Sequence, residues 1–239
     1  MNGKIPIVDW RFGDKYYVTE FITPRNVMVE NIARLYKGRS EIESFINVAR
    51  WIRDKFYYPL DWRGQPSCDG QFLKSRKRFG SYHFRKCVAY MWLFPPETIN
   101  MGFGICIDTA LLATSVLIAM GLDAWCVLGA IYDNKGELIG YHAWTEVLID
   151  NTWYLLETTI HMEGVSNIMK RDDAYTGKYG IKYEKFAMFN DKTYHEYKSI
   201  LQYMKFFGKG KREIRNMEMK KQRFIWQTYK EVTTLLIPV

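Results

Sequence analysis

A cysteine at the start of a predicted helix is the first residue of this sequence that could do chemistry. Gly102 and Gly104 form a turn signal before Cys106, and a strongly apolar helix is expected from about 106 to 120. The helix dipole and the unsatisfied N–H groups at such a position stabilise a thiolate. The pattern therefore favours a nucleophilic cysteine, although a lone buried cysteine is more often a small hydrophobic residue.

A base and an orienting acid follow this cysteine in the sequence. His142 lies in the middle of a predicted strand at 138–149, and Glu157 lies in the next predicted strand, at 152–160. A nucleophilic cysteine needs a base, and a third group should orient the imidazole ring. Taken singly, the histidine could be a hydrogen-bonded structural residue, and the glutamate could lie on the solvated face of its strand.

The turn between these two strands decides whether the histidine and the acid can meet. If the two-residue turn 150–151 is a hairpin turn, Ile149 pairs with Thr152. Glu157 then shares a face of the sheet with His142 as a diagonal neighbour, within reach of a glutamate side chain. A slip by one residue would place Glu157 on the opposite face.

The surrounding pattern predicts an α+β fold in which the cysteine-bearing helix packs on an antiparallel β-sheet. Ser40 and Glu43 form a capping-box pattern at the start of one helix. Residues 61–97 are irregular, basic and aromatic, and are expected to be an insertion. The other expected elements are a strand at 14–22, helices from Thr23-Pro24 to about Gly38 and at 41–56, a strand at 124–132, and helices at 193–207 and 211–232.

Several motifs together resemble the transglutaminase-like superfamily, which shares the papain-like arrangement of a cysteine helix on a β-sheet. The matching residues are Gly104-Ile105-Cys106-Ile107-Asp108, Ala110-Leu111-Leu112, Met120-Gly121-Leu122-Asp123-Ala124, His142-Ala143-Trp144-Thr145-Glu146-Val147 and Trp153-Tyr154-Leu155-Leu156-Glu157-Thr158-Thr159. The stretch from Ile42 to Tyr58 resembles the family's helix leading into an aromatic strand.

The resemblance also implies a domain organisation. Residues 1–160 would form a transglutaminase-like domain of the catalytic type, with its core at 24–60 and 100–160. Residues 161–239 would form a mostly helical extension, basic towards its end, packed on this core and outside the family fold.

The resemblance implies acyl transfer through a thioester, with Cys106 as nucleophile, His142 as base and Glu157 as orienting acid. Water would then give hydrolysis, and an amine would give crosslinking. The family usually has Asp where this chain has Glu157, so the longer side chain must reach the histidine differently.

An oxyanion hole would complete such a site. The backbone N–H of Cys106 is one expected donor. Asn100 resembles the side-chain donor of papain-type enzymes, and Trp62 and Trp92 are alternatives.

The positive charge of the chain is confined to two segments. The net charge is +8, whereas the segments around 74–86 and 205–223 together carry +12, so the rest carries −4. The two segments could bind an anionic partner such as nucleic acid, a membrane surface or an acidic protein, or they could simply be solvated. Any nucleic-acid binding by the second segment would weaken steeply with salt.

Composition excludes several other classes of protein. With 48% hydrophobic residues the chain is not disordered, and four cysteines in 239 residues do not make a disulfide scaffold. Cys68, Cys87 and Cys126 are expected to be structural, and no C-x-x-C pair indicates a metal site; we expect no cofactor. No signal peptide or membrane span is apparent, which predicts a protein of the cytoplasm or of a complex made inside the cell.

Three functions remain open at this point. The first is a cysteine-dependent amide hydrolase or acyltransferase acting on a peptide or protein. The second is a non-catalytic assembly or binding component, for example of a virion, that reuses the same fold. The third is a nucleic-acid-binding accessory protein. The sequence leaves the substrate and the oligomeric state open.

Overall fold

A computed structural model gives the fold, and it describes residues 5–9, 14–56, 92–159 and 167–199. Its helices are η2 (Val18–Phe21, a 3₁₀ helix), α1 (Val27–Tyr36), α2 (Glu41–Lys55), α5 (Pro95–Met101), α6 (Cys106–Ala119) and α7 (Arg171–Thr176). Its strands are β1 (Ile7–Asp9), β2 (Lys15–Tyr17), β3 (Asp123–Tyr132), β4 (Leu138–Ile149), β5 (Thr152–Leu156), β6 (Ile168–Lys170), β7 (Lys182–Phe189) and β8 (Tyr194–Glu196).

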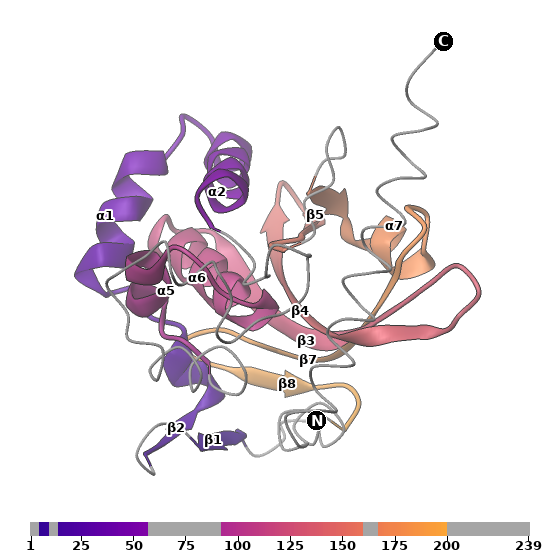
Figure 1. Cartoon of the computed structure of the whole chain (residues 1–239). Helices are drawn as coiled ribbons and strands as arrows, with labels where there is room; N and C mark the ends of the chain where they lie inside the picture. The colour runs from indigo at the N-terminus through magenta and orange to yellow at the C-terminus, as the bar shows by residue number, and fades with distance from the viewer. Residues whose placement is uncertain (1–4, 10–13, 57–91, 160–166, 200–239) are drawn as a thin grey trace, which may run out of the picture.

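One antiparallel sheet organises the described residues. Its six strands follow the order β6-β5-β4-β3-β7-β8, and β1 and β2 form a separate two-stranded sheet. Helices α1, α2, α5 and α6 gather on one side, whereas α7 lies near β5 and β7 on the other (Figure 1). The predicted α+β architecture, with the cysteine helix packed on an antiparallel sheet, is confirmed.

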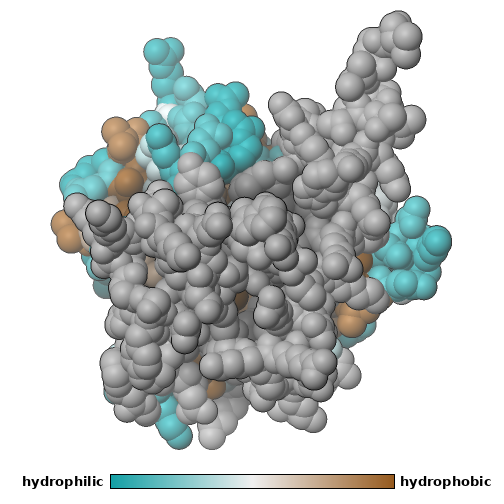
Figure 2. Space-filling view, viewed as in Figure 1, coloured by the Kyte–Doolittle hydropathy of each residue, from teal (hydrophilic) through white to brown (hydrophobic). Residues whose placement is uncertain are grey.

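Helix α6 is the central helix of the molecule. All its residues from Cys106 to Leu117 are buried, and a helix that is apolar all round requires such surroundings. It packs against β3 and β4 on one side and against α1, α2 and α5 on the others. The exposed surface over α1 and α2 is largely hydrophilic, with a few hydrophobic spots (Figure 2). Val27 and Leu35 of α1 are exposed hydrophobic residues.

The alternation along β4 gives the sheet two chemically different faces. Ala143 and Val147 face α6, and the Thr145 hydroxyl donates to the Ala110 carbonyl of that helix (3.1 Å). His142, Trp144 and Glu146 alternate to the other side of the strand. We call this other side the His142 face; its apolar part includes Val127, Ile131, Trp144, Leu155 and Tyr183.

Two expectations near the N-terminus are wrong in detail. The helix expected to start at Thr23-Pro24 begins at Val27, because Asn26 is the residue that caps it: its Oδ1 accepts the N–H of Met28 at 3.0 Å. The strand expected at 14–22 covers only Lys15–Tyr17 before the chain turns into η2.

The expected mostly helical extension at 161–239 is wrong over the residues that the structure describes there. Between 167 and 199 the chain forms three strands and one short helix, and β7 pairs with β3 inside the main sheet. The helix expected at 193–207 is replaced at 194–196 by β8, because Tyr194 is buried on the sheet and pairs with Phe189. Tertiary pairing overrides local propensity here.

The end of the expected insertion belongs to the core. Trp92 and Leu93 are buried, and α5 begins at Pro95, so residues 92–97 pack into the core and lead into a helix rather than forming part of an insertion. Trp62, the basic segments 74–86 and 205–223 and the helix expected at 211–232 lie outside the described residues. Among the helices that the structure does describe, none has the length and apolar character needed to cross a bilayer.

Truncation of a buried side chain of α6 tests the central place of this helix. We expect Leu111→Ala to lower the free energy of unfolding by about 2–5 kcal/mol, because Leu111 is fully buried and a cavity would remain. Leu35→Ala is the matched control, since Leu35 is 71% exposed on α1 and should change stability by less than about 0.5 kcal/mol. Urea denaturation of both variants makes the comparison, and equal losses would contradict this packing.

Candidate functional site

The hairpin between β4 and β5 has the predicted register. Asp150 and Asn151 both adopt left-handed conformations, with φ of 48° and 60°, as a two-residue type I′ turn requires. Ile149 pairs with Thr152. Strand β5 ends at Leu156, so Glu157 is the first residue after it rather than a residue within it.

His142 and Glu157 meet directly. The Nε2 atom of His142 lies 2.7 Å from Oε2 of Glu157, and both side chains are almost completely buried. Because an ionised carboxylate only accepts hydrogen bonds, Nε2 is the donor in this contact. The other ring nitrogen, Nδ1, is therefore the atom through which His142 would exchange a proton with another group.

Three further donors hold the carboxylate of Glu157. The Tyr183 hydroxyl donates to Oε2 at 2.8 Å, and the backbone N–H and hydroxyl of Thr159 donate to Oε1 at 2.9 and 3.1 Å. Both carboxylate oxygens are thus occupied, so the position of Glu157 is determined from two sides. These contacts fix the orientation in which the Glu157 carboxylate faces His142.

These contacts also set the charge of Glu157. Burial by itself would raise its pKa, but the charge and hydrogen bond of His142, the Thr159 N–H and the Tyr183 hydroxyl together lower the pKa from 4.5 to about 2. The carboxylate is consequently ionised at neutral pH. A buried anion beside the imidazole favours the protonated ring.

Cys106 is the first residue of α6 and is 4% exposed. The start of this helix is held by Asp108, whose carboxylate accepts the N–H groups of Ile105 (2.9 Å) and Leu93 (2.8 Å). Gly104 gives the room for this contact, since a Cβ there would lie 2.7 Å from the Cβ of Asp108. Gly104 thus allows Asp108 to cap the start of α6.

A hydroxyl pair connects the start of α6 with the acid. The Thr109 hydroxyl, one turn after Cys106, donates to the Thr158 hydroxyl at 2.8 Å, and Thr158 directly follows Glu157. Cys106 also packs in the same core cluster as Ala143, which directly follows His142. These contacts place the start of α6 next to the residues that follow Glu157 and next to the strand that carries His142.

The expected oxyanion donors have different surroundings. Asn100 is exposed, and its Nδ2 lies 4.0 Å from the sulfur of Met28, so the structure gives its proposed role no support. Trp92 is buried in the same core cluster as Cys106 and stacks on Phe189. It is the better candidate among the described residues.

The sequence did not point to Tyr183, and it gave Asp108 only as part of a motif. A signal for Asp108 was present, because an acid three residues after the N-cap residue, here Ile105, is a capping-box position. The sequence did not predict a second buried polar cluster either: Glu146 accepts from Trp144 Nε1 (3.2 Å), Lys185 Nζ (2.7 Å) and the Tyr175 hydroxyl.

The second cysteine of the described core differs from Cys106. Cys126 is fully buried on β3, and burial together with the charge of Cys106 raises the pKa of its thiol well above the usual range. Within the described ranges, no group of three or more His, Cys, Asp or Glu side chains could hold a metal ion.

Comparison with known families now places this chain. A family model described as a transglutaminase-like domain matches residues 27–179, which is more than half of the sequence. The chain therefore belongs to the transglutaminase-like domain family. The match extends past residue 160, the predicted end of the family fold, and includes β6 and α7.

Individual relatives are distant. UPF0252 protein MJ1282 of Methanocaldococcus jannaschii is 23% identical over 163 residues, which cover 65% of this chain and 42% of that protein. This chain thus spans less than half the length of that relative.

Matches among solved structures are distant as well. A candidate cysteine protease from Cytophaga hutchinsonii is 15% identical, with a TM-score of 0.43 over 75% of this chain and 48% of that one. LapG of Legionella pneumophila is 15% identical, with a TM-score of 0.38 over 83% of this chain and 96% of that one.

The lowered pKa of Glu157 predicts a dependence of stability on pH. The folded state gains stability from ionised Glu157 above pH 4.5 and loses it as the pH falls towards 2. We expect the stability advantage of the wild type over Glu157→Gln to shrink on the order of 3 kcal/mol across this window, at about 1.4 kcal/mol per pKa unit.

Urea denaturation at several pH values between 7 and 2.5 measures this difference. Glu137→Gln is the matched control, since Glu137 is an exposed carboxylate in the turn between β3 and β4. A Glu157→Gln variant whose stability follows the same pH curve as the wild type would contradict the assignment.

Proposed function

We propose that the protein is a cysteine-dependent amide hydrolase or acyltransferase in which Cys106 is the nucleophile, His142 the base and Glu157 the orienting acid. The observation that carries this proposal is the buried hydrogen bond between His142 Nε2 and Glu157. It occupies one ring nitrogen and commits the other, Nδ1, to the exchange of the thiol proton. Membership of the transglutaminase-like family supports the same assignment.

The proposed chemistry proceeds through a thioester. His142 Nδ1 takes the thiol proton, and the thiolate of Cys106 attacks the carbonyl carbon of an amide, forming a C–S bond. As the C–N bond breaks, His142 returns this proton to the leaving amine. The backbone N–H of Cys106 and the Trp92 side chain are the proposed donors to the oxyanion.

In the second half of the reaction, the thioester is cleaved and the Cys106 thiol is regenerated. With water as acceptor, the products are a carboxylic acid and the thiol; with an amine, they are a new amide and the thiol. Glu157 remains ionised throughout and stabilises the imidazolium form of His142. The proposed substrate is a peptide or protein, because an amide carbonyl is the group that this arrangement attacks.

Acyl transfer from an activated ester tests the nucleophile without knowledge of the natural substrate. We expect p-nitrophenyl acetate to acetylate Cys106, seen by mass spectrometry as one acetyl group on the peptide that contains it. Cys106→Ala should abolish this adduct, and His142→Ala should slow its formation about 10²–10⁴-fold, the usual contribution of a general base.

Cys126→Ala is the matched control, because Cys126 is a buried thiol with a raised pKa on the same core cluster. It should leave the adduct on Cys106 unchanged. Acetylation at equal rates in the wild type and in His142→Ala would overturn the proposed roles.

The presence of Glu rather than Asp at position 157 gives a further prediction. Shortening the side chain by Glu157→Asp would withdraw the carboxylate from contacts with His142, Tyr183 and Thr159, which lie at 2.7–3.1 Å. We therefore expect Glu157→Asp to lower the rate of Cys106 acetylation by at least about tenfold, since a hydrogen bond to a charged group contributes roughly 1.5–3 kcal/mol.

Glu146→Asp is the control for this experiment, because it shortens a neighbouring buried carboxylate that does not contact His142 in the described structure. If Glu157→Asp acetylates as fast as the wild type, the longer side chain has no particular role in this chain.

Burial favours a second candidate function. Cys106 is 4% exposed and His142 is fully buried, which suits a non-catalytic assembly or binding component that keeps the fold. This candidate predicts no acyl adduct on Cys106 in the folded wild type and an adduct only after denaturation. The acetylation experiment thus separates the two candidates directly.

A further inference from the structure

Strand β7 contains an irregularity beside the candidate site. Leu128 of β3 pairs with Ala187, but the next residue, Gly129, pairs with Lys185, so Phe186 has no partner on β3. Its carbonyl instead accepts the N–H groups of Tyr197 (2.7 Å) and Lys198 (3.0 Å) after β8. Such β-bulges often lie next to active sites, where they redirect side chains.

The bulge changes which face of the sheet Tyr183 occupies. In a regular strand, residues four apart point to the same side, so Tyr183 would follow Ala187 towards α6. The extra residue reverses this alternation: Phe186 and Ala187 both pack in the core against α6, whereas Tyr183 packs on the His142 face.

Gly129 makes room for this arrangement. A Cβ at Gly129 would lie 2.1 Å from the Glu184 carbonyl oxygen and 2.6 Å from Cη2 of Trp144. Gly129 also pairs with His142 on its other side. A glycine at this point of β3 therefore lets β7, the Trp144 ring and the strand of His142 approach one another.

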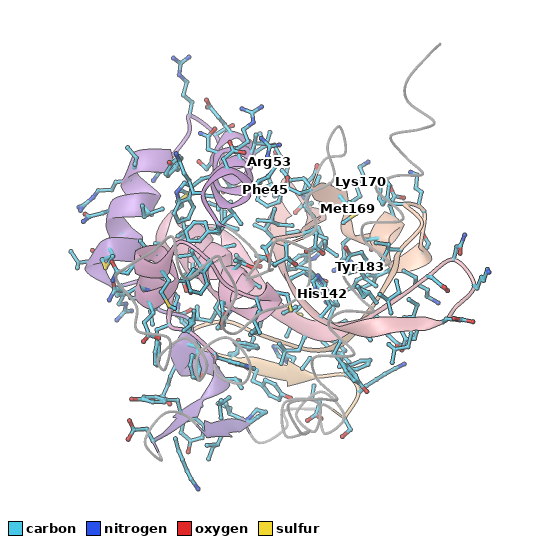
Figure 3. All side chains as sticks on the ribbon, viewed as in Figure 1. Phe45, Arg53, His142, Met169, Lys170 and Tyr183 are labelled. Atoms are coloured by element: carbon cyan, nitrogen blue, oxygen red, sulfur yellow. The ribbon has the colours of Figure 1, made fainter. Side chains whose placement is uncertain are left out.

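The redirected tyrosine reaches the acid of the site. Its hydroxyl donates to the same Glu157 oxygen that accepts from His142. Its ring centroid lies 5.2 Å from that of Trp144, edge to face, and 6.3 Å from that of His142; the tyrosine and the histidine lie next to each other in Figure 3. Burial, and then the charge of Glu157, raise the pKa of Tyr183 well above its usual value, so the hydroxyl remains a donor.

We propose that Tyr183 is a positioning residue of this site, delivered by the β7 bulge to hold the Glu157 carboxylate against His142. This inference rests on the proposed function. A glutamate has one more rotatable bond than the aspartate that is usual in the family, and therefore more rotamers to exclude. Tyr183 restrains one carboxylate oxygen and Thr159 restrains the other.

The test compares Tyr183→Phe with Tyr175→Phe. Tyr175 also donates its hydroxyl to a buried carboxylate, that of Glu146, but it does not contact Glu157 in the described structure. The readout is the rate constant for alkylation of Cys106 by iodoacetamide between pH 4 and pH 9, measured peptide by peptide with mass spectrometry. Urea denaturation of each variant records the loss of stability.

We expect Tyr183→Phe to reduce the alkylation rate of Cys106 at neutral pH about tenfold, because it removes a hydrogen bond to a charged group. The acid limb of its pH profile should move to higher pH, because a Glu157 carboxylate that is held less firmly stabilises the imidazolium form of His142, and with it the Cys106 thiolate, less well. Tyr175→Phe should lose similar stability while keeping the wild-type rate and profile. Equal profiles for Tyr183→Phe and the wild type would overturn the inference.

His142→Ala separates this inference from the proposed function. If His142→Ala leaves the alkylation of Cys106 unchanged, the proposed function fails and the inference fails with it. If His142→Ala slows alkylation but Tyr183→Phe does not, only the inference fails.

A measurement on the wild type covers the case in which Tyr183→Phe does not fold. Methylthiolation of Cys106 removes the thiolate and weakens the charge on His142, so the NMR resonance of the Tyr183 hydroxyl proton should move through their shared carboxylate. The Tyr175 hydroxyl resonance should stay in place. A Tyr183 resonance that does not respond would overturn the inference.

Discussion

A buried, ionised carboxylate is the constraint on which this structure depends. Removing Glu157 from water costs several kcal/mol unless donors replace its hydration. Those donors are His142 of β4, Tyr183 of β7 and both donor groups of Thr159 after β5. Because they come from three separate segments, the order and register of the sheet must be correct before the carboxylate is satisfied.

The local part of this arrangement could be predicted from the sequence. The turn at 150–151 fixes the pairing of β4 with β5, and period-two alternation then places His142 and Glu157 on one face. Likewise, the apolar run after Cys106 predicts a buried helix, and α6 is buried over almost its whole length. Short-range pattern is sufficient for both features.

The contribution of β7 could not be predicted, because it depends on pairing between distant segments. No residue pattern near Tyr183 predicts a bulge. The bulge follows from the pairing of Lys185 with Gly129, and only this pairing shows on which face of the sheet Tyr183 lies. The helix predicted at 193–207 is wrong for a similar reason: the pairing of β8 with β7 overrides local propensity. Gly129 looks like an ordinary strand glycine until the carbonyl of Glu184 is placed against it.

In the proposed mechanism, Cys106 and His142 form one coupled acid–base pair, with Glu157 behind the histidine. The most direct measurement is an NMR titration of the His142 ring nitrogens in the wild type and in Cys106→Ala. A thiolate beside the ring favours the imidazolium, so the account predicts that His142 titrates at lower pH once Cys106 is replaced. Identical titration curves in the two proteins would contradict it.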